Sequence, residues 1–194
     1  MPRVFQQVDW SNGGDGIVIR RSAAANPAKP TMADLRGKKI VLAQNSPSEY
    51  FVLNALVNGG VQPSEVDFKP VGDAFQAAAA FQADKSIAAC VSWAPDIYNL
   101  SEVDGNHLLV STATANKLIA DVWFARADFA RDHMDICEGL VRGIFDGIDK
   151  METTAGRTEA SNLMSTMYGI PADETLAMLG DAHSTNYAEN RDFF

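Results

Sequence analysis

The residues best suited to bind a small molecule lie in the polar loop Asn45–Ser48, between an apolar run and an amphipathic stretch. Ser46 suits the N-cap of a helix, Pro47 suits its first position, and Glu49 completes an S-x-x-E capping box. Free backbone N–H groups at such a helix start attract polar or negatively charged groups. Ser46 and Glu49 could also satisfy those amides themselves. The Glu49 carboxylate therefore favours a zwitterionic or neutral polar ligand over a fully anionic one.

Tryptophan and aspartate side chains add further candidate binding groups. Trp93 ends an apolar run, where an aromatic ring could cover a ligand in the cleft of an open α/β sheet, although a core position fits the sequence equally well. Asp121 interrupts an apolar run, so its carboxylate must face water, a partner or a ligand. An ammonium-like group could be held by a set drawn from both kinds of residue: Trp10, Asp15, Trp93, Asp96 and Asp121.

No catalytic motif accompanies these groups. The G-x-S-x-G, G-x-G-x-x-G and P-loop patterns are absent, and the three histidines are scattered. The glycine-rich stretch 13–16 leads into a β-branched run, which favours a turn between strands. Cys90 and Cys137 lie in patterns typical of small buried hydrophobic residues, with a disulfide as the lesser alternative. We therefore expect no enzymatic activity, no metal site and no cofactor.

Composition limits the class of protein and of partner. The 194 residues are 46% hydrophobic and 21% charged, as in ordinary globular proteins. No apolar run approaches the ~20 residues needed to span a membrane, and no signal peptide is visible at the N-terminus. The net charge of -9 argues against a nucleic-acid partner. Both ends of the chain look cut, so we expect a fragment of a longer protein.

The elements that must position the candidate groups alternate between strand and helix up to residue 110. Apolar runs predict strands at 4–8, 17–20, 40–43, 66–71, 87–93, 107–110 and 119–124. Helical spacing and caps predict helices at 47–58, 73–83, 96–100, 135–151, 158–168 and 171–179. This order predicts a mostly parallel sheet with right-handed crossovers over residues 38–110.

Residue spacing supports two of these helices. In the helix over 73–83, Phe75, Ala78, Ala79 and Gln82 are spaced by three and four. In the helix over 135–151, an apolar stripe that should face a core consists of Ile136, Leu140, Ile144 and Ile148.

Four stretches, taken in order and spacing, resemble the periplasmic solute-binding proteins of ABC importers: DGIVIR, DLRGKKIVLAQNSPSEYFVLNAL, AAFQADKSIAACVSWAPDIY and LIADVWFARADFARDH. The resemblance covers nearly the whole chain and is closest to the nitrate, sulfonate, taurine, bicarbonate and thiamine-pyrimidine-precursor group. It implies an α/β, type II periplasmic-binding-protein-like fold. In this fold, hinge closure of two lobes holds the ligand in an interlobe cleft.

The resemblance also implies a domain organisation and a placement of the candidate groups. Residues 1–30 would form part of the first lobe and a crossing strand, 31–112 the complete second lobe, and 113–194 the return strand and C-terminal helices of the first lobe. Loop Asn45–Ser48 is similar to the helix start that faces ligand, and Trp93 and Asp96 to the second-lobe wall. Asp121 is similar to a position on the returning strand. The start of the first lobe has no counterpart.

The function implied by the resemblance is non-enzymatic. The intact parent would be a periplasmic solute-binding component that delivers a small polar or zwitterionic ligand to ABC permease subunits. Two alternatives stay open, namely an effector-binding regulatory domain of the same fold and a pyrimidine-precursor enzyme built on it. A truncated first lobe would expose apolar surface and unpaired strand edges, so self-association by strand exchange is also expected.

Overall fold

The computed structural model describes residues 1–115 and 117–194 and divides the chain into two compact units. Unit 1 consists of Met1–Ser11 together with Ala120–Phe194, and unit 2 is the continuous segment Asn12–Ile119. The chain therefore passes between the units twice. Within the described residues, no helix is long and apolar enough to cross a membrane.

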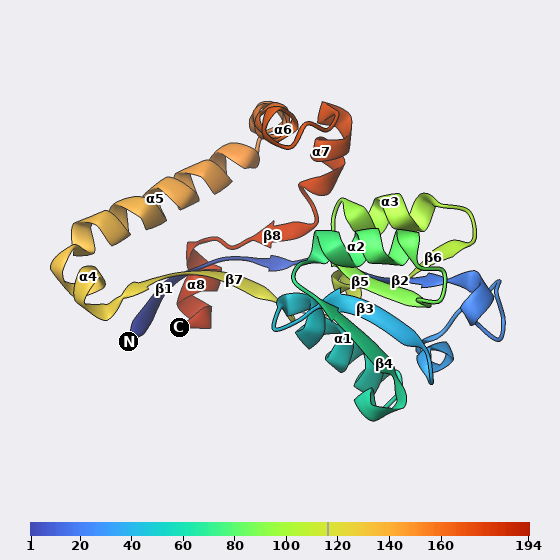
Figure 1. The fold of residues 1–194 in the computed structure, drawn as a ribbon. Helices are drawn as coiled ribbons and strands as arrows, with labels where there is room; N and C mark the ends of the chain where they lie inside the picture. The colour runs from blue at the N-terminus through green and yellow to red at the C-terminus, as the bar shows by residue number, and fades with distance from the viewer. Residues whose placement is uncertain (116) are drawn as a thin grey trace. The chain divides into compact units, whose positions relative to one another are not determined.

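A five-stranded sheet forms the centre of unit 2 (Figure 1). Its order is β4-β3-β5-β2-β6, with bounds Asp67–Val71, Lys39–Ala43, Ala89–Trp93, Asp15–Arg20 and Asn106–Ser111. Strand β3 pairs in parallel with β4 and β5, whereas β2 is antiparallel to both of its neighbours. The prediction of a mostly parallel sheet is confirmed for β4, β3 and β5, and β2 separates β6 from them.

Helices cover both faces of this sheet. Helix α1 (Pro47–Asn58) packs Phe51, Val52 and Leu56 on one face, against inward side chains of β3 and β5. Helices α2 (Ala74–Ala83) and α3 (Asp96–Glu102) cover the opposite face with Phe81, Ile97 and Leu100, among others. Residues 17 to 19 of β2 are fully buried, because this strand has a helical layer on each side. Unit 2 is thus a three-layer α/β/α structure.

The buried face of α2 differs from the set of residues that indicates this helix in the sequence. The residues facing the core are Ala74, Ala77, Ala78 and Phe81, whereas Phe75 is 60% exposed. Asp73 caps the helix by accepting a hydrogen bond from the Gln76 N–H at 2.8 Å. This cap sets the start of the helix, and packing against Val41 and Cys90 of the sheet decides which of its positions face inward. Of the four residues that support this helix by their spacing in the sequence, only Ala78 is buried.

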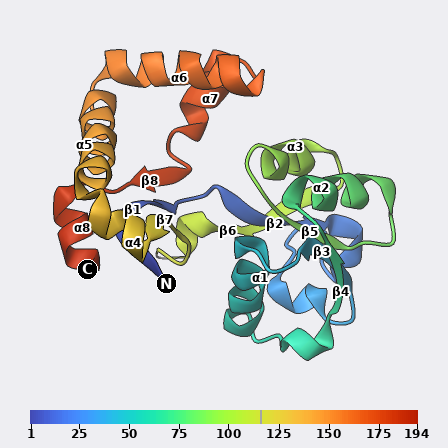
Figure 2. The same ribbon diagram turned by 60° about the vertical axis from the view of Figure 1, so that its left-hand side comes forward.

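Unit 1 contains a three-stranded antiparallel sheet of order β7-β1-β8, with bounds Ala120–Arg126, Pro2–Ser11 and Ala182–Ser184. Its helices are α4 (Ala127–Asp132), α5 (Met134–Met151), α6 (Thr154–Tyr168), α7 (Ala172–Met178) and α8 (Tyr187–Phe193). Figure 2 shows α6 and α7 side by side beyond the end of α5. Strand β1 is longer than predicted, so Asp9 and Trp10 lie in a strand and not in a turn.

Strand β8 and helix α8 were not predicted, although the sequence carries a signal for the helix. Asn186 and Glu189 form a capping box at the start of α8, and N-x-x-E is a variant of the S-x-x-E pattern.

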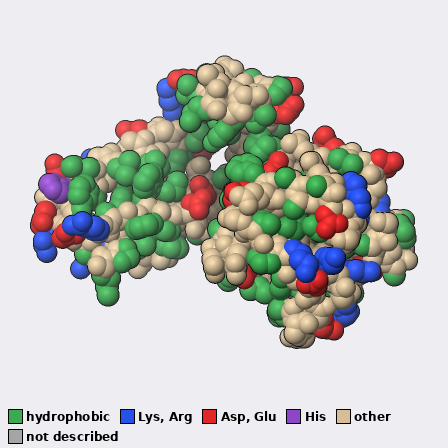
Figure 3. Space-filling model, viewed as in Figure 1, with side chains coloured by type: hydrophobic (Ala, Val, Ile, Leu, Met, Phe, Trp, Pro, Cys, Tyr) green, Lys and Arg blue, Asp and Glu red, His purple; other side chains and the backbone are tan. Residues whose placement is uncertain are grey.

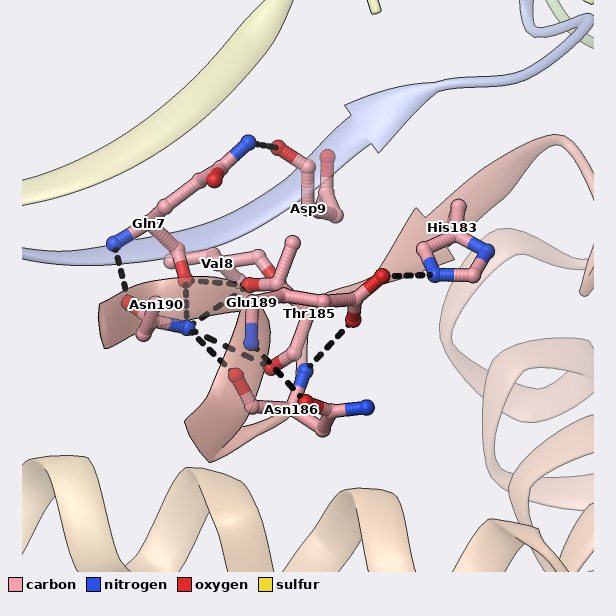
Figure 4. A network of polar contacts seen from close by, with 8 residues as sticks. All are labelled: Gln7, Val8, Asp9, His183, Thr185, Asn186, Glu189 and Asn190. Atoms are coloured by element: carbon pink, nitrogen blue, oxygen red, sulfur yellow. Dashed lines mark hydrogen bonds and ion pairs between the residues drawn. The ribbon is translucent and has the colours of Figure 1, made fainter. Parts of the chain in front are cut away.

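Asn190 of α8 is the centre of a polar network that joins the two ends of the chain (Figure 4). Its side-chain oxygen accepts a hydrogen bond from the Gln7 N–H at 2.8 Å, and its amide nitrogen donates to the Gln7 carbonyl at 3.0 Å. The same nitrogen lies 3.0 Å from Thr185 Oγ1, and the Thr185 N–H donates to the Val8 carbonyl at 2.9 Å. The network therefore attaches the C-terminal helix to β1.

Much of the apolar surface of unit 1 is uncovered. Of the predicted stripe on α5, Ile148 is buried, but Ile136 and Leu140 are 53% and 38% exposed, so their predicted burial is wrong. Figure 3 shows hydrophobic side chains on the visible surface of this part of unit 1. A sheet of only three strands offers too little surface to cover an 18-residue helix. Cys90 and Cys137 are free and buried, as predicted.

The first unit boundary lies before residue 12 and not at the expected residue 30, because β2 is an inner strand of unit 2. The second lies after residue 119 and not at the expected residue 112. The assignment of these units to lobes of a larger protein stays a prediction.

Replacing Asn190 with alanine should destabilise unit 1. The Asn190→Ala variant removes a buried hydrogen-bond partner of the Gln7 backbone N–H and carbonyl. The free energy of unfolding should fall by about 2–3 kcal/mol. Urea unfolding measures this loss of stability, and hydrogen exchange of the β1 amides locates it in unit 1. Asn162→Ala, at an exposed position of α6, is the control and should change stability by less than about 0.5 kcal/mol. Equal effects of the two variants would contradict a structural role for the network.

Candidate functional site

Most of the candidate groups gather at one edge of unit 2. The loop Asn45–Ser48 follows β3, Trp93 is the last residue of β5, and Asp96 begins α3. Asp15 begins the antiparallel strand β2 and pairs directly with Trp93. Because carboxyl ends of parallel strands meet at one edge of a sheet, these groups share the edge where open α/β folds bind ligands.

The loop after β3 turns sharply before helix α1 begins. Ser46 is the N-cap, its hydroxyl accepts from the Ser48 N–H at 3.2 Å, and Pro47 begins the helix, as predicted. The predicted capping box is not formed. Asn45 adopts a left-handed conformation with φ 53°, and Glu49 accepts from the Asn45 N–H at 2.6 Å instead of from Ser46. Asparagine tolerates this conformation better than most residues. The consequence is a carboxylate beside the start of α1.

The members of this loop differ in their access to solvent. Asn45 and Pro47 are exposed, and Ser46 is partly buried. Ser48 is fully buried, and its hydroxyl has no hydrogen-bond partner among the described residues. The exposed side chain of Asn45 is therefore better placed than Ser48 to meet a ligand.

The loop after β5 presents an aromatic ring and a carboxyl group. Trp93 is half-buried and contacts Phe75 edge-on, with ring centroids 6.1 Å apart and an interplanar angle of 82°. Burial raises the pKa of Asp96, because removing the carboxylate from water disfavours its charged form. Asp15 is buried, and its N–H donates to Thr112 Oγ1 at 3.2 Å. Phe75 was not among the candidate groups named from the sequence, although its position two residues after the Asp73 cap places it at the start of α2.

The charge of this edge is one-sided. The loops and helix starts over residues 44–49, 72–75 and 94–98 contain Glu49, Asp73 and Asp96 and no lysine or arginine. Asp73 is already used as the cap of α2. These carboxylates repel a fully anionic ligand and attract a cationic group.

The two remaining candidates lie in unit 1, where they are neighbours on adjacent strands. Trp10 is buried and stacks on His183 with ring centroids 4.0 Å apart, so one of its faces is already covered. His183 Nε2 in turn lies 3.1 Å from Glu189 Oε1 (Figure 4). Asp121 is exposed on β7, directly opposite Asp9 of β1. Burial raises the pKa of Asp9 to about 6, and the charge of Asp121 adds to the effect.

Metal binding has no support in the described part of the chain, which holds no group of three or more His, Cys, Asp or Glu side chains suited to a metal ion.

The three-layer unit with its mixed sheet, joined twice to a second unit, defines an α/β protein with the type II periplasmic-binding fold. The fold is shared with the periplasmic aliphatic sulphonate binding protein SsuA from Escherichia coli, at a TM-score of 0.74 and 22% identity over 94% of this chain and 60% of that one. It is also found in the desulfurization enzyme DSZB, at a TM-score of 0.63 and 16% identity over 97% and 66%. The fold alone therefore does not separate binding proteins from enzymes.

Residues 22–154 match the profile of the NMT1/THI5 like family, and the chain belongs to this family. A relative by sequence is the taurine-binding periplasmic protein of Escherichia coli (strain K12), 30% identical over 145 residues, or 74% of this chain and 42% of the relative. The chain thus spans less than half the length of this relative. The resemblance inferred from the sequence is confirmed at the level of the family and the fold.

Replacing Asp9 should change how stability depends on pH. The folded-state pKa of Asp9 is raised from 3.8 to about 6, so the folded state binds more protons than the unfolded state between these values. Stability from this group is present below about pH 4 and is lost as pH rises through 6. Asp9→Asn should remove this loss and stabilise unit 1 at pH 7 by about 1 kcal/mol, after allowance for solvent screening of a partly exposed carboxyl.

Thermal unfolding at pH 4 and pH 7 measures this effect. The gain from Asp9→Asn should be larger at pH 7, whereas Asp132→Asn, at an exposed position of α4, should show little gain at either pH. An equal gain at both pH values would contradict the raised pKa of Asp9.

Proposed function

We propose that this chain is part of the solute-binding component of an ABC importer, and that unit 2 carries one wall of its ligand site. Membership of the NMT1/THI5 like family and the similarity to a taurine-binding periplasmic protein support this proposal. The parent protein would be periplasmic, would have permease subunits as partners and would bind its solute without chemical change.

The ligand in this proposal is a small zwitterion of the amino-sulfonate class. The observation that carries it is the charge of the candidate edge, where Glu49 and Asp96 lie on loops that contain no lysine or arginine. An inorganic anion such as nitrate or bicarbonate would be repelled by these carboxylates. A zwitterion brings its own positive charge, which offsets the repulsion.

Each end of such a ligand has a suitable counterpart on unit 2. The ammonium group would lie near Asp96 and the face of Trp93, since carboxylates and indole rings both attract cations. The sulfonate would accept hydrogen bonds near the start of α1, where the helix dipole favours negative charge, with the exposed Asn45 side chain as a further donor. Burial around Asp96 strengthens its attraction for a cation relative to an exposed carboxylate. Trp10, Asp15 and Asp121 remain proposed as further binding residues.

Ligand discrimination tests this proposal. The 194-residue chain should bind taurine more tightly than ethanesulfonate, which lacks the ammonium group, and more tightly than nitrate or bicarbonate, in isothermal titration calorimetry. Asp96→Asn should weaken taurine binding about tenfold and ethanesulfonate binding by much less, because only taurine loses an ion pair.

The matched control is Asp104→Asn, which precedes β6 at the opposite edge of the sheet and should leave both affinities unchanged. Tighter binding of nitrate than of taurine, or equal effects of Asp96→Asn on taurine and ethanesulfonate, would overturn the proposed ligand class.

Self-association follows from the uncovered surface of unit 1. Strand β7 is at the edge of the sheet β7-β1-β8, and Trp123 and Phe124 on it are exposed. An exposed edge strand with aromatic side chains can pair with the same strand of a second copy. We expect a dimer at tens of micromolar in sedimentation velocity. Phe124→Lys should shift it to monomer, whereas Phe193→Lys on α8 should not. A wild-type monomer would contradict pairing through β7.

A further inference from the structure

An aromatic side chain at the candidate edge has no structural role that explains its position. Phe75 is 60% exposed, although it sits on α2 beside four residues that pack into the core. A single exposed aromatic residue is ordinary on a protein surface. Phe75 differs because its ring meets a second aromatic ring, that of Trp93, at the edge where the candidate binding groups gather.

The position of Phe75 is fixed from two sides. Asp73 caps α2 and sets the start of the helix. The buried hydroxyl of Ser92, the residue before Trp93, donates to the carbonyl of Ala74, the residue before Phe75, at 3.3 Å. This hydrogen bond holds the chain segments that carry the two aromatic residues next to each other.

The ring pair lies at the edge of the sheet where β3, β4 and β5 end. Phe75 follows β4 and Trp93 ends β5, and β3 lies between these strands in the sheet. The loop Asn45–Ser48 leaves β3 at the same edge. An edge-to-face pair at this place presents apolar ring surface beside the polar groups of the loops. An amino-sulfonate as small as taurine has too little apolar surface to cover two rings.

We infer that Phe75 and Trp93 form a subsite for an apolar body of the ligand, and that the solute carries an aromatic ring or a comparable apolar group beside its charged groups. Phe75 is then a specificity-determining residue. This inference rests on the proposed function and narrows its ligand class from small zwitterions to those with an apolar body.

Three probes separate this inference from the proposed function: taurine, 4-(aminomethyl)benzenesulfonate and benzylammonium. The first two carry the same charges and differ by a ring, whereas the third keeps the ring and the cation and lacks the sulfonate. The chain should bind 4-(aminomethyl)benzenesulfonate about tenfold or more tightly than taurine in calorimetry, since burying a ring removes apolar surface from water.

Substitution of Phe75 locates the difference in affinity. Phe75→Ala should weaken the binding of both aromatic probes about tenfold and change the affinity for taurine by less than about twofold. Phe75→Leu should restore part of the lost affinity. Val57→Ala is the control, because Val57 is 57% exposed near the far end of α1 and should alter no affinity. Thermal melts verify that each variant folds.

The outcomes are distinct. Equal affinity for taurine and its aryl analogue, or a Phe75→Ala variant that binds the aryl analogue as wild type does, overturns the inference and leaves the proposed function standing. Binding of benzylammonium alone, sensitive to Phe75→Ala, supports the aromatic subsite and overturns the amino-sulfonate class. Failure of all three probes to bind overturns both.

Discussion

The burial of both faces of the unit 2 sheet is the constraint on which the rest of that unit depends. Helix α1 covers one face and helices α2 and α3 cover the other, so most side chains of the inner strands β3, β5 and β2 are buried. The strand ends are the places where functional groups can be presented. This is why Trp93, Asp96 and the loop Asn45–Ser48 share one edge although they are far apart in sequence.

Unit 1 lacks such a cover, and its stability depends on different interactions. Its sheet has three strands, and large apolar side chains of α5 and β7 are exposed. Asn190 compensates in part, because its buried amide joins α8 to β1 through hydrogen bonds that water does not weaken. Exposed apolar surface of this extent favours contact with a second protein surface.

The two properties of the candidate edge lead to one description of its ligand. The carboxylates favour a positively charged group, and the partly exposed pair of Phe75 and Trp93 favours an apolar one. The start of α1, by contrast, favours a negatively charged group. The Glu49 carboxylate, which accepts the Asn45 N–H, weakens that preference. Selectivity for a ligand at this edge would therefore depend on the balance between the helix dipole of α1 and the Glu49 carboxylate. It would depend more on burial of an aromatic ring of the ligand than on the ligand's net charge.

The sequence by itself determined the local structure and the family. Apolar runs located the strands of unit 2, and Ser46 with Pro47 located the start of α1, because caps and periodicity act between residues close in the chain. Tertiary structure decided the place of β2 between β5 and β6 and the outward orientation of Phe75. It also decided the pairing of Asp9 with Asp121. Each of these depends on which distant segment lies across from a residue, and periodicity along the chain carries no record of that partner.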